Sequence, residues 1–124
     1  MDSNPKTQYG IAKPGLSSVP PLALLAIGQV MANGSAKYGS MNWRNKPVSS
    51  SVYYDAAMRH LMAWWDGQDR DPESGLLHLA HAAANLCILL DADSGFWLRD
   101  NRPQFGYTST FISDNTKKVN THGD

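Results

Sequence analysis

Residues 76–90 contain the feature that most constrains this chain, an apolar run, LLHLAHAAANLCILL, with polar residues along one side. His78, His81 and Asn85 stand at positions i, i+3 and i+7, so on an α-helix they project within about 60° of one another. The other positions are Leu, Ala, Ile and Cys, which is typical of a helix buried on nearly every side. Because an unpaired buried polar group costs on the order of 1–3 kcal/mol, this stripe must face a partner, a ligand or water.

Three segments have helical patterns, at about 20–34, about 51–65 and, around the stripe, about 71–95. The first has a Pro-Pro start and an Asn-Gly end, which suit the two ends of a helix. The third is expected to begin at Asp71-Pro72-Glu73, because Asp is a favoured N-cap, Pro suits the first turn and Glu favours the positive end of the helix dipole.

The fold class predicted from these segments is all-α, a compact and oligomeric helical bundle formed by residues 20–103. Residues 1–19 are rich in Pro, Gly and Ser, and we expect an irregular N-terminal arm. Residues 104–124 are mostly Thr, Ser, Asn and Lys with scattered aromatics, and we expect a polar C-terminal tail.

Composition excludes several classes of protein. Lys plus Arg and Asp plus Glu both number 11, so no overall charge attracts a nucleic acid polymer or an anionic membrane. The single cysteine, Cys87, can form neither an internal disulfide nor a cysteine zinc site. No signal peptide and no membrane-spanning stretch is visible, so we expect a cytoplasmic protein.

Imidazoles and carboxylates around the stripe are candidate metal ligands and catalytic groups. Imidazole suits Mn²⁺ or Zn²⁺, whereas Mg²⁺ takes carboxylates first, and we expect Mg²⁺ or Mn²⁺ as the cofactor. The alternative is a buried network in which the histidines bond to Asn and to the backbone without a metal. The candidate ligands are His60, Asp71, Glu73, His78 and His81, and the last four are also the candidate catalytic residues.

The segment 35–51 contains cations and aromatic residues that would suit a nucleotide. Arg offers paired contacts to phosphate and Lys a point charge, and an aromatic ring that stacks on a base contributes about 1–3 kcal/mol. Each of these residues taken singly is more often a surface or packing residue. With neighbours on the predicted helices, the candidate nucleotide-binding set is Lys37, Tyr38, Asn42, Trp43, Arg44, Arg59 and Asn85.

Three ordered motifs extend this interpretation: KYG..NW from Lys37, RHL.AW..G from Arg59, and D.ESGL.HLAHAA.N from Asp71. Over roughly residues 11–103 the chain resembles the small phage dATP/dGTP diphosphohydrolases, grouped with the MazG-like (MazZ-type) all-α nucleoside triphosphate pyrophosphohydrolases. The resemblance implies cleavage of purine deoxynucleoside triphosphates to monophosphates and pyrophosphate, with divalent metals, in control of the phage nucleotide pool.

The chain departs from the usual MazG-like pattern in its metal ligands. MazG-like enzymes usually bind metal through ExxE on one helix and ExxD on the next, and neither motif is present. His78 and His81 stand where an ExxD is expected, and Gly67–Gln68 stands where relatives tend to have Gly-Glu. A nucleotide-binding or signal-sequestering protein of the same fold is therefore an alternative to the enzyme, and a purely structural oligomer is a third.

The predicted helices 20–34 and 71–95 are apolar on more of their surface than three helices can bury among themselves. We therefore expect a homodimer or homotetramer, with sites near the subunit boundaries.

Overall fold

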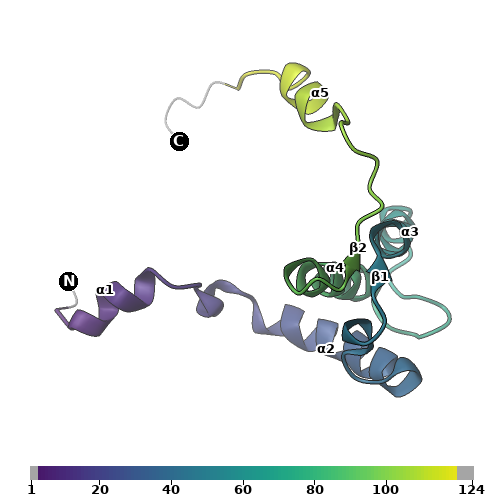
Figure 1. The fold of residues 1–124 in the computed structure, drawn as a ribbon, viewed down its shortest axis with the longest axis horizontal. Helices are drawn as coiled ribbons and strands as arrows, with labels where there is room; N and C mark the ends of the chain where they lie inside the picture. The colour runs from purple at the N-terminus through teal and green to yellow at the C-terminus, as the bar shows by residue number, and fades with distance from the viewer. Residues whose placement is uncertain (1–2, 120–124) are drawn as a thin grey trace.

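The computed structural model describes residues 3–119 and is predominantly helical, as predicted (Figure 1). Two-residue strands and single 3₁₀ turns are its only other regular elements within those residues. In chain order the elements are α1 (Pro5–Ile11), η1 (Leu16–Ser18), α2 (Pro21–Tyr38), η2 (Asn42–Arg44), β1 (Val48–Ser49), α3 (Ser50–Trp65), α4 (His78–Ser94), β2 (Leu98–Arg99) and α5 (Thr108–Asp114).

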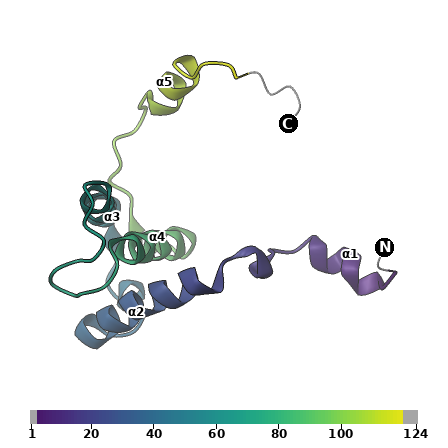
Figure 2. The same cartoon turned by 180° about the vertical axis from the view of Figure 1, so that it is seen from behind.

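The helices α2, α3 and α4 form the body of the molecule, with α3 beside α4 and α2 against the other side of α4 (Figures 1 and 2). Small buried side chains lie on both of these helices: Ala57 on α3, and Ala80, Ala82 and Ala84 on α4. Alanine on facing helices lets the two backbones approach closely, and this brings polar side chains on neighbouring turns within reach of one another.

The predicted end of α2 at Asn33–Gly34 is wrong, because the helix continues to Tyr38. Asn33 and Gly34 are half-buried in the body of the molecule, and such packing outweighs a propensity cost of about 1 kcal/mol for glycine. The helix ends instead at Gly39, whose φ of 91° is readily adopted only by glycine.

The predicted start of the third helix at Asp71 is also wrong, because α4 begins at His78. The Asp71 carboxylate accepts hydrogen bonds from the backbone N–H groups of Glu73 and Ser74, at 2.7 and 3.1 Å. This closes a turn and not a helix, since such local bonds compete with the helical ladder. Gly75 follows with a φ of 74°, so Asp71 lies in the loop before α4.

A short parallel pairing closes the other end of the body. Val48 of β1 pairs with Leu98 of β2, and next to it the buried Trp43, Val48 and Ala92 form an apolar core. The α3 helix starts directly after β1 and runs from Ser50 to Trp65, close to its predicted bounds. Cys87 is half-buried on α4.

Both predicted arms contain a short helix where irregular chain is expected. Asn4 caps α1 by accepting a hydrogen bond from the Lys6 N–H at 2.9 Å, and Pro5 occupies the first turn of the helix. Asn followed by Pro is a helix start signal, which the Pro, Gly and Ser content of this segment obscures. No residue of α1 or α5 is buried, and both helices project from the body (Figure 2). Within residues 3–119, no helix is long and apolar enough to cross a membrane.

Candidate metal centre

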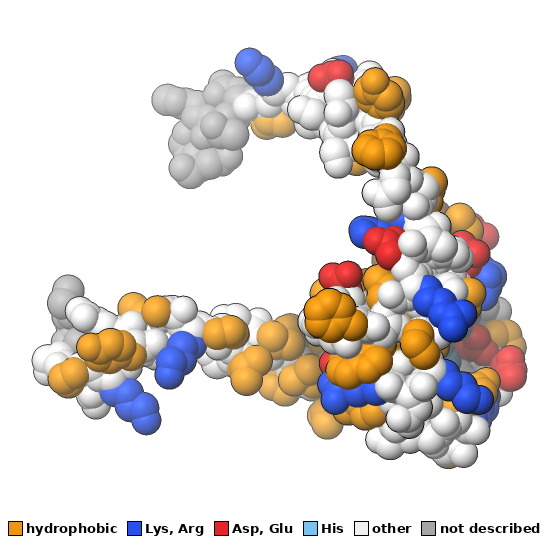
Figure 3. Space-filling view, in the orientation of Figure 1, with side chains coloured by type: hydrophobic (Ala, Val, Ile, Leu, Met, Phe, Trp, Pro, Cys, Tyr) orange, Lys and Arg blue, Asp and Glu red, His pale blue; other side chains and the backbone are white. Residues whose placement is uncertain are grey.

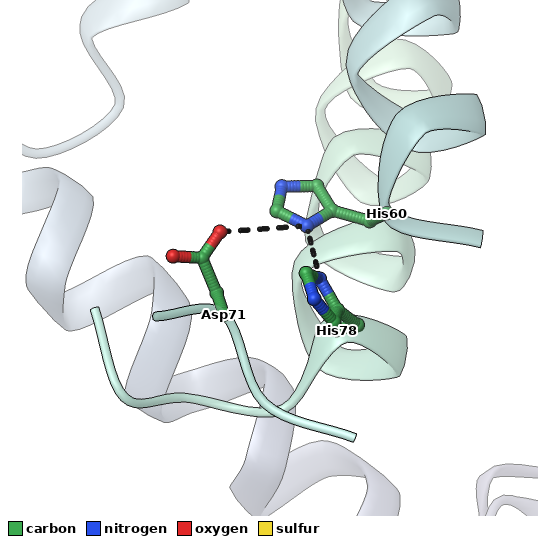
Figure 4. Close-up of side chains that lie close together, drawn as sticks. All are labelled: His60, Asp71 and His78. Carbon is green, nitrogen blue, oxygen red and sulfur yellow. Dashed lines mark hydrogen bonds and ion pairs between the residues drawn. The ribbon is translucent and has the colours of Figure 1, made fainter. Parts of the chain in front are cut away.

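Three side chains from two helices and the loop between them converge beside the α3–α4 contact (Figure 4). His60 projects from α3, His78 from the first position of α4, and Asp71 from the intervening loop. The Nδ1 atoms of His60 and His78 are 2.8 Å apart, and His60 Nδ1 lies 3.8 Å from Asp71 Oδ2. One ligand atom from each of the three lies within 4.8 Å of the others.

The local structure orients Asp71 toward this centre. Its Oδ1 accepts the two backbone hydrogen bonds that form the loop turn, while Oδ2 is the oxygen nearest His60. Burial opposes ionisation of Asp71, but the N–H groups of Ser74 and Glu73 and the neighbouring imidazoles outweigh it, so the pKa of Asp71 lies below its usual value. The centre therefore holds a carboxylate at neutral pH.

His78 is held by both its backbone and its ring. It is 4% exposed, its backbone N–H donates to Asp69 O at 2.9 Å, and its Nε2 lies 2.7 Å from Gln68 Oε1. An amide oxygen only accepts, so the proton of a neutral His78 stands on Nε2 and the lone pair on Nδ1. With this tautomer of His78, His60 donates its Nδ1–H to that lone pair.

His81 lies one turn further along α4 and stacks on His60, with ring centroids 4.5 Å apart and an angle of 6° between the planes. Its Nε2 is 2.7 Å from Ser74 Oγ, which also accepts the Leu76 N–H. Burial is the largest cause that lowers the pKa of both His60 and His81, and the neighbouring imidazoles add to it. Both rings are therefore neutral at pH 7, the form in which imidazole binds a metal.

The donor atoms fit a divalent cation. Metal–nitrogen distances of about 2.0–2.1 Å need the two imidazole nitrogens only slightly further apart than the hydrogen bond that now joins them. Two imidazoles and one carboxylate leave a further coordination position open, as catalytic sites do. The contact from His78 Nε2 to Gln68 is the kind of second bond that fixes a metal-binding imidazole. Such a set favours Mn²⁺ or Zn²⁺ over Mg²⁺.

A cavity of about 220 Å³ adjoins the centre, and His81 connects the two because it lines the cavity and stacks on His60. Lys37 lies near enough to lower the pKa of His81 through its charge. The cavity brings together most of the predicted nucleotide-binding residues. Those that line it are Lys37, Tyr38, Asn42, Trp43 and Asn85.

Several sequence-predicted residues lie outside the centre. Glu73 and Arg59 are exposed, and the Glu73 side chain is not among the three convergent ligands. Arg44 binds the carboxylate of Asp91 with two hydrogen bonds, at 2.6 and 2.9 Å, and covers the ring of Trp97.

Trp43 has a structural contact as well as a place in the cavity wall. It is 6% exposed, and its Nε1–H donates to Asp91 at 2.7 Å. Residue patterns do not predict the contacts that Asp91, Gln68 and Ser74 make here. For Asp91 the sequence offers one signal: it is an acidic residue in the largely apolar segment 76–92, so a polar partner is expected beside it.

Comparison with known proteins gives a family match over most of the chain. The family model described as dATP/dGTP diphosphohydrolase, N-terminal, matches residues 3–101. A dATP/dGTP diphosphohydrolase of Salmonella phage PMBT28 is 36% identical over 96 residues. That alignment covers 77% of this chain and 30% of the relative, so the chain spans less than a third of that protein's length. No solved structure matches.

Proposed function

The chain belongs to the family described as dATP/dGTP diphosphohydrolase, N-terminal, and from this premise we propose that it is a metal-dependent nucleotide hydrolase unit. Its substrates are purine deoxynucleoside triphosphates, in line with the name of the phage relative. Water attacks the α-phosphorus, the bond from that phosphorus to the oxygen bridging to the β-phosphorus breaks, and a monophosphate and pyrophosphate leave. The reaction serves nucleotide-pool control in the cytoplasm of an infected cell.

The observation that carries this proposal is the convergence of His60, Asp71 and His78 beside a cavity that Lys37 lines. A structural histidine network explains the His60–His78 bond. It does not explain why the loop turn also brings Asp71 Oδ2 to 3.8 Å from His60 Nδ1. A centre of two imidazoles and one carboxylate suits a divalent cation.

The residues of the chain have distinct roles in this proposal. His60, Asp71 and His78 hold the cation, which would screen the phosphate charges and activate water for attack. Lys37 neutralises part of the triphosphate charge from the cavity wall. His81 is neutral and lies between cavity and centre, where it can take up a proton from the attacking water.

The base lies near Tyr38 and Asn85 in this proposal. Tyr38 lines the cavity and is 71% exposed, so its ring is free to stack on a purine. Asn85 donates its side-chain N–H to the His81 carbonyl at 2.9 Å, which leaves its amide oxygen as an acceptor. An acceptor of this kind suits the exocyclic amine of adenine or guanine.

A second candidate is a nucleotide-binding protein without turnover. The specific observation in its favour is that the centre contains a single carboxylate, whereas hydrolases of this class commonly gather several around their metals. The pairing of Arg44 with Asp91 also reduces the positive charge near the cavity.

One experiment separates the two candidates. The purified chain is incubated with each of the four deoxynucleoside triphosphates and with Mn²⁺, Zn²⁺ or Mg²⁺, and released pyrophosphate is measured. Turnover of purine substrates that His78→Ala or Asp71→Asn abolishes supports the hydrolase. Saturable nucleotide binding without pyrophosphate release in any metal supports the binding protein instead, and the absence of both rejects the site.

A further inference from the structure

The outer face of α4 is an apolar surface that nothing in residues 3–119 covers. Leu79, Leu86 and Leu90 are spaced by seven and four residues, so they lie along one side of the helix. Leu90 is 74% exposed. Beside this row runs a groove of about 740 Å³, whose apolar walls include Leu86, Leu89, Leu90 and Leu98.

The chain also carries an apolar C-terminal segment whose large side chains are exposed. The helix α5 exposes Phe111 and Ile112, and the preceding residues Phe105 and Tyr107 are exposed too. This C-terminal arm starts immediately after Pro103, which lines the groove, and it leads away from α4 in both ribbon views. Figure 3 shows hydrophobic side chains along both arms.

The total exposed area indicates how much surface a partner must cover. The chain exposes 10424 Å², whereas a folded monomer of 13.6 kDa exposes about 6,600 Å². The excess is roughly 3,800 Å², and a standard interface needs only about 800 Å² from each partner. A quarter of the excess would therefore supply a stable dimer interface.

We infer that the partner is a second copy of this chain, and that the C-terminal arm of each copy lies in the α4 groove of the other. A second copy supplies both complementary features at once, the groove and the aromatic arm, and a two-fold axis repeats the contact. The charges are complementary: Asp93 in the groove lining is negative, and Lys117 and Lys118 after α5 are positive. Arg102 also lines the groove, but its charge is paired with Asp100. This inference stands independently of the hydrolase proposal.

The test uses the whole chain and measures its mass by sedimentation equilibrium at about 50 μM. The wild-type protein is expected at twice 13.6 kDa. Leu90→Glu in the groove and Phe111→Lys in the arm are each expected to weaken the dimer by at least tenfold. Val52→Glu changes a similarly exposed apolar residue on α3 outside the groove lining, and serves as the matched control. Far-ultraviolet circular dichroism confirms that each variant is folded.

Mixing the two weakened variants distinguishes arm exchange from simple contact between leucine rows. In a mixed dimer, the Phe111→Lys chain offers an unaltered groove to an unaltered arm. The second contact pairs the new glutamate with the new lysine. Recovery of dimer on mixing is therefore expected. A wild-type monomer, a Leu90→Glu dimer of unchanged affinity, or a mixture that stays monomeric would each overturn arm exchange.

Discussion

The Nδ1 atoms of His60 and His78 lie 2.8 Å apart, a distance at which only one of the two nitrogens can carry a proton. Gln68 determines which one, since its amide oxygen accepts the Nε2–H of His78 and leaves the Nδ1 lone pair of that ring directed at His60. A cation bound to both rings would replace this shared proton, because it would use the same two nitrogen lone pairs. Metal binding therefore competes with a single proton and needs only a slight separation of the two nitrogens.

Substitution of a proposed ligand should abolish tight metal binding. Removing one of three protein ligands from a divalent site leaves an incomplete coordination shell, so His60→Ala, His78→Ala and Asp71→Asn should each lower the affinity for Zn²⁺ or Mn²⁺ by about 100-fold or more. Isothermal titration calorimetry measures this directly. Asp69→Asn, an exposed acid in the same loop, is the matched control and should bind as the wild type does.

Glu73→Gln tests the wider ligand set that the sequence suggests. The Glu73 side chain is exposed and lies outside the three convergent ligands, so its substitution should change metal affinity less than threefold. A loss comparable to that of Asp71→Asn would show that the loop rearranges to bring Glu73 to the metal.

Gln68 should act as a positioning residue for His78. Gln68→Leu removes the acceptor of the Nε2–H, so metal affinity should fall about 10-fold to 100-fold. Gln68→Glu keeps an acceptor at the same position and should preserve binding. Nitrogen chemical shifts of the imidazole report the tautomer, and they should show Nε2–H in the wild type and a mixture in Gln68→Leu. Unchanged shifts and unchanged affinity in Gln68→Leu would rule out this role.

The sequence predicts α3 well because its periodicity and its glycine stop agree. It fails at the end of α2, where Asn33 and Gly34 have the local signature of a stop but are packed into the body of the molecule. The sequence also fails at the start of α4, because a local start signal there does not begin a helix. There, the side chain of Asp71 caps a turn that Gly75 closes, and the N-cap signature does not distinguish this turn from a first helical turn.

The convergence of His60 with His78 can be anticipated, since two adjacent helices joined by one loop place the residues near that loop opposite one another. The contacts of Trp43 and Arg44 cannot be anticipated from the sequence. Both bind Asp91, which follows them by 48 and 47 residues, and only the path of the chain between α2 and α3 brings them there. The partners of Gln68 depend likewise on the course of a loop, which residue patterns do not specify.

Lys37 should contribute to binding through phosphate charge alone. A charge-assisted hydrogen bond contributes about 1.5–3 kcal/mol, so Lys37→Met should weaken binding of a non-hydrolysable deoxynucleoside triphosphate about 10-fold to 100-fold. Binding of the corresponding nucleoside should be unchanged. Lys46→Met removes an exposed lysine that does not line the cavity, and it should affect neither ligand. Equal weakening of triphosphate and nucleoside by Lys37→Met would indicate a packing role and reject the phosphate contact.

Asp91 should make the fold sensitive to acid. Hydrogen bonds from Arg44 and Trp43 lower the pKa of its carboxyl from 3.8 to about 2. Because these partners are brought together only by folding, the pKa returns to its ordinary value in the unfolded chain. The stabilisation is therefore complete above pH about 4 and is lost as the pH falls toward about 2.

Asp100 offers a matched comparison for this acid effect, because its pKa is also lowered to about 2, by hydrogen bonds from Arg102. Asp100 and Arg102 are only two positions apart, so they can pair in the unfolded chain too, and Ser50, the partner from a distant segment, is the smallest cause of the lowered pKa. We therefore expect Asp100 to contribute little to the dependence of stability on pH. Thermal unfolding followed between pH 5 and pH 2 should thus show a flatter decline for Asp91→Asn than for the wild type. Asp100→Asn should follow the wild type. Parallel declines in all three proteins would mean that the bonds from Trp43 and Arg44 to Asp91 do not stabilise the fold.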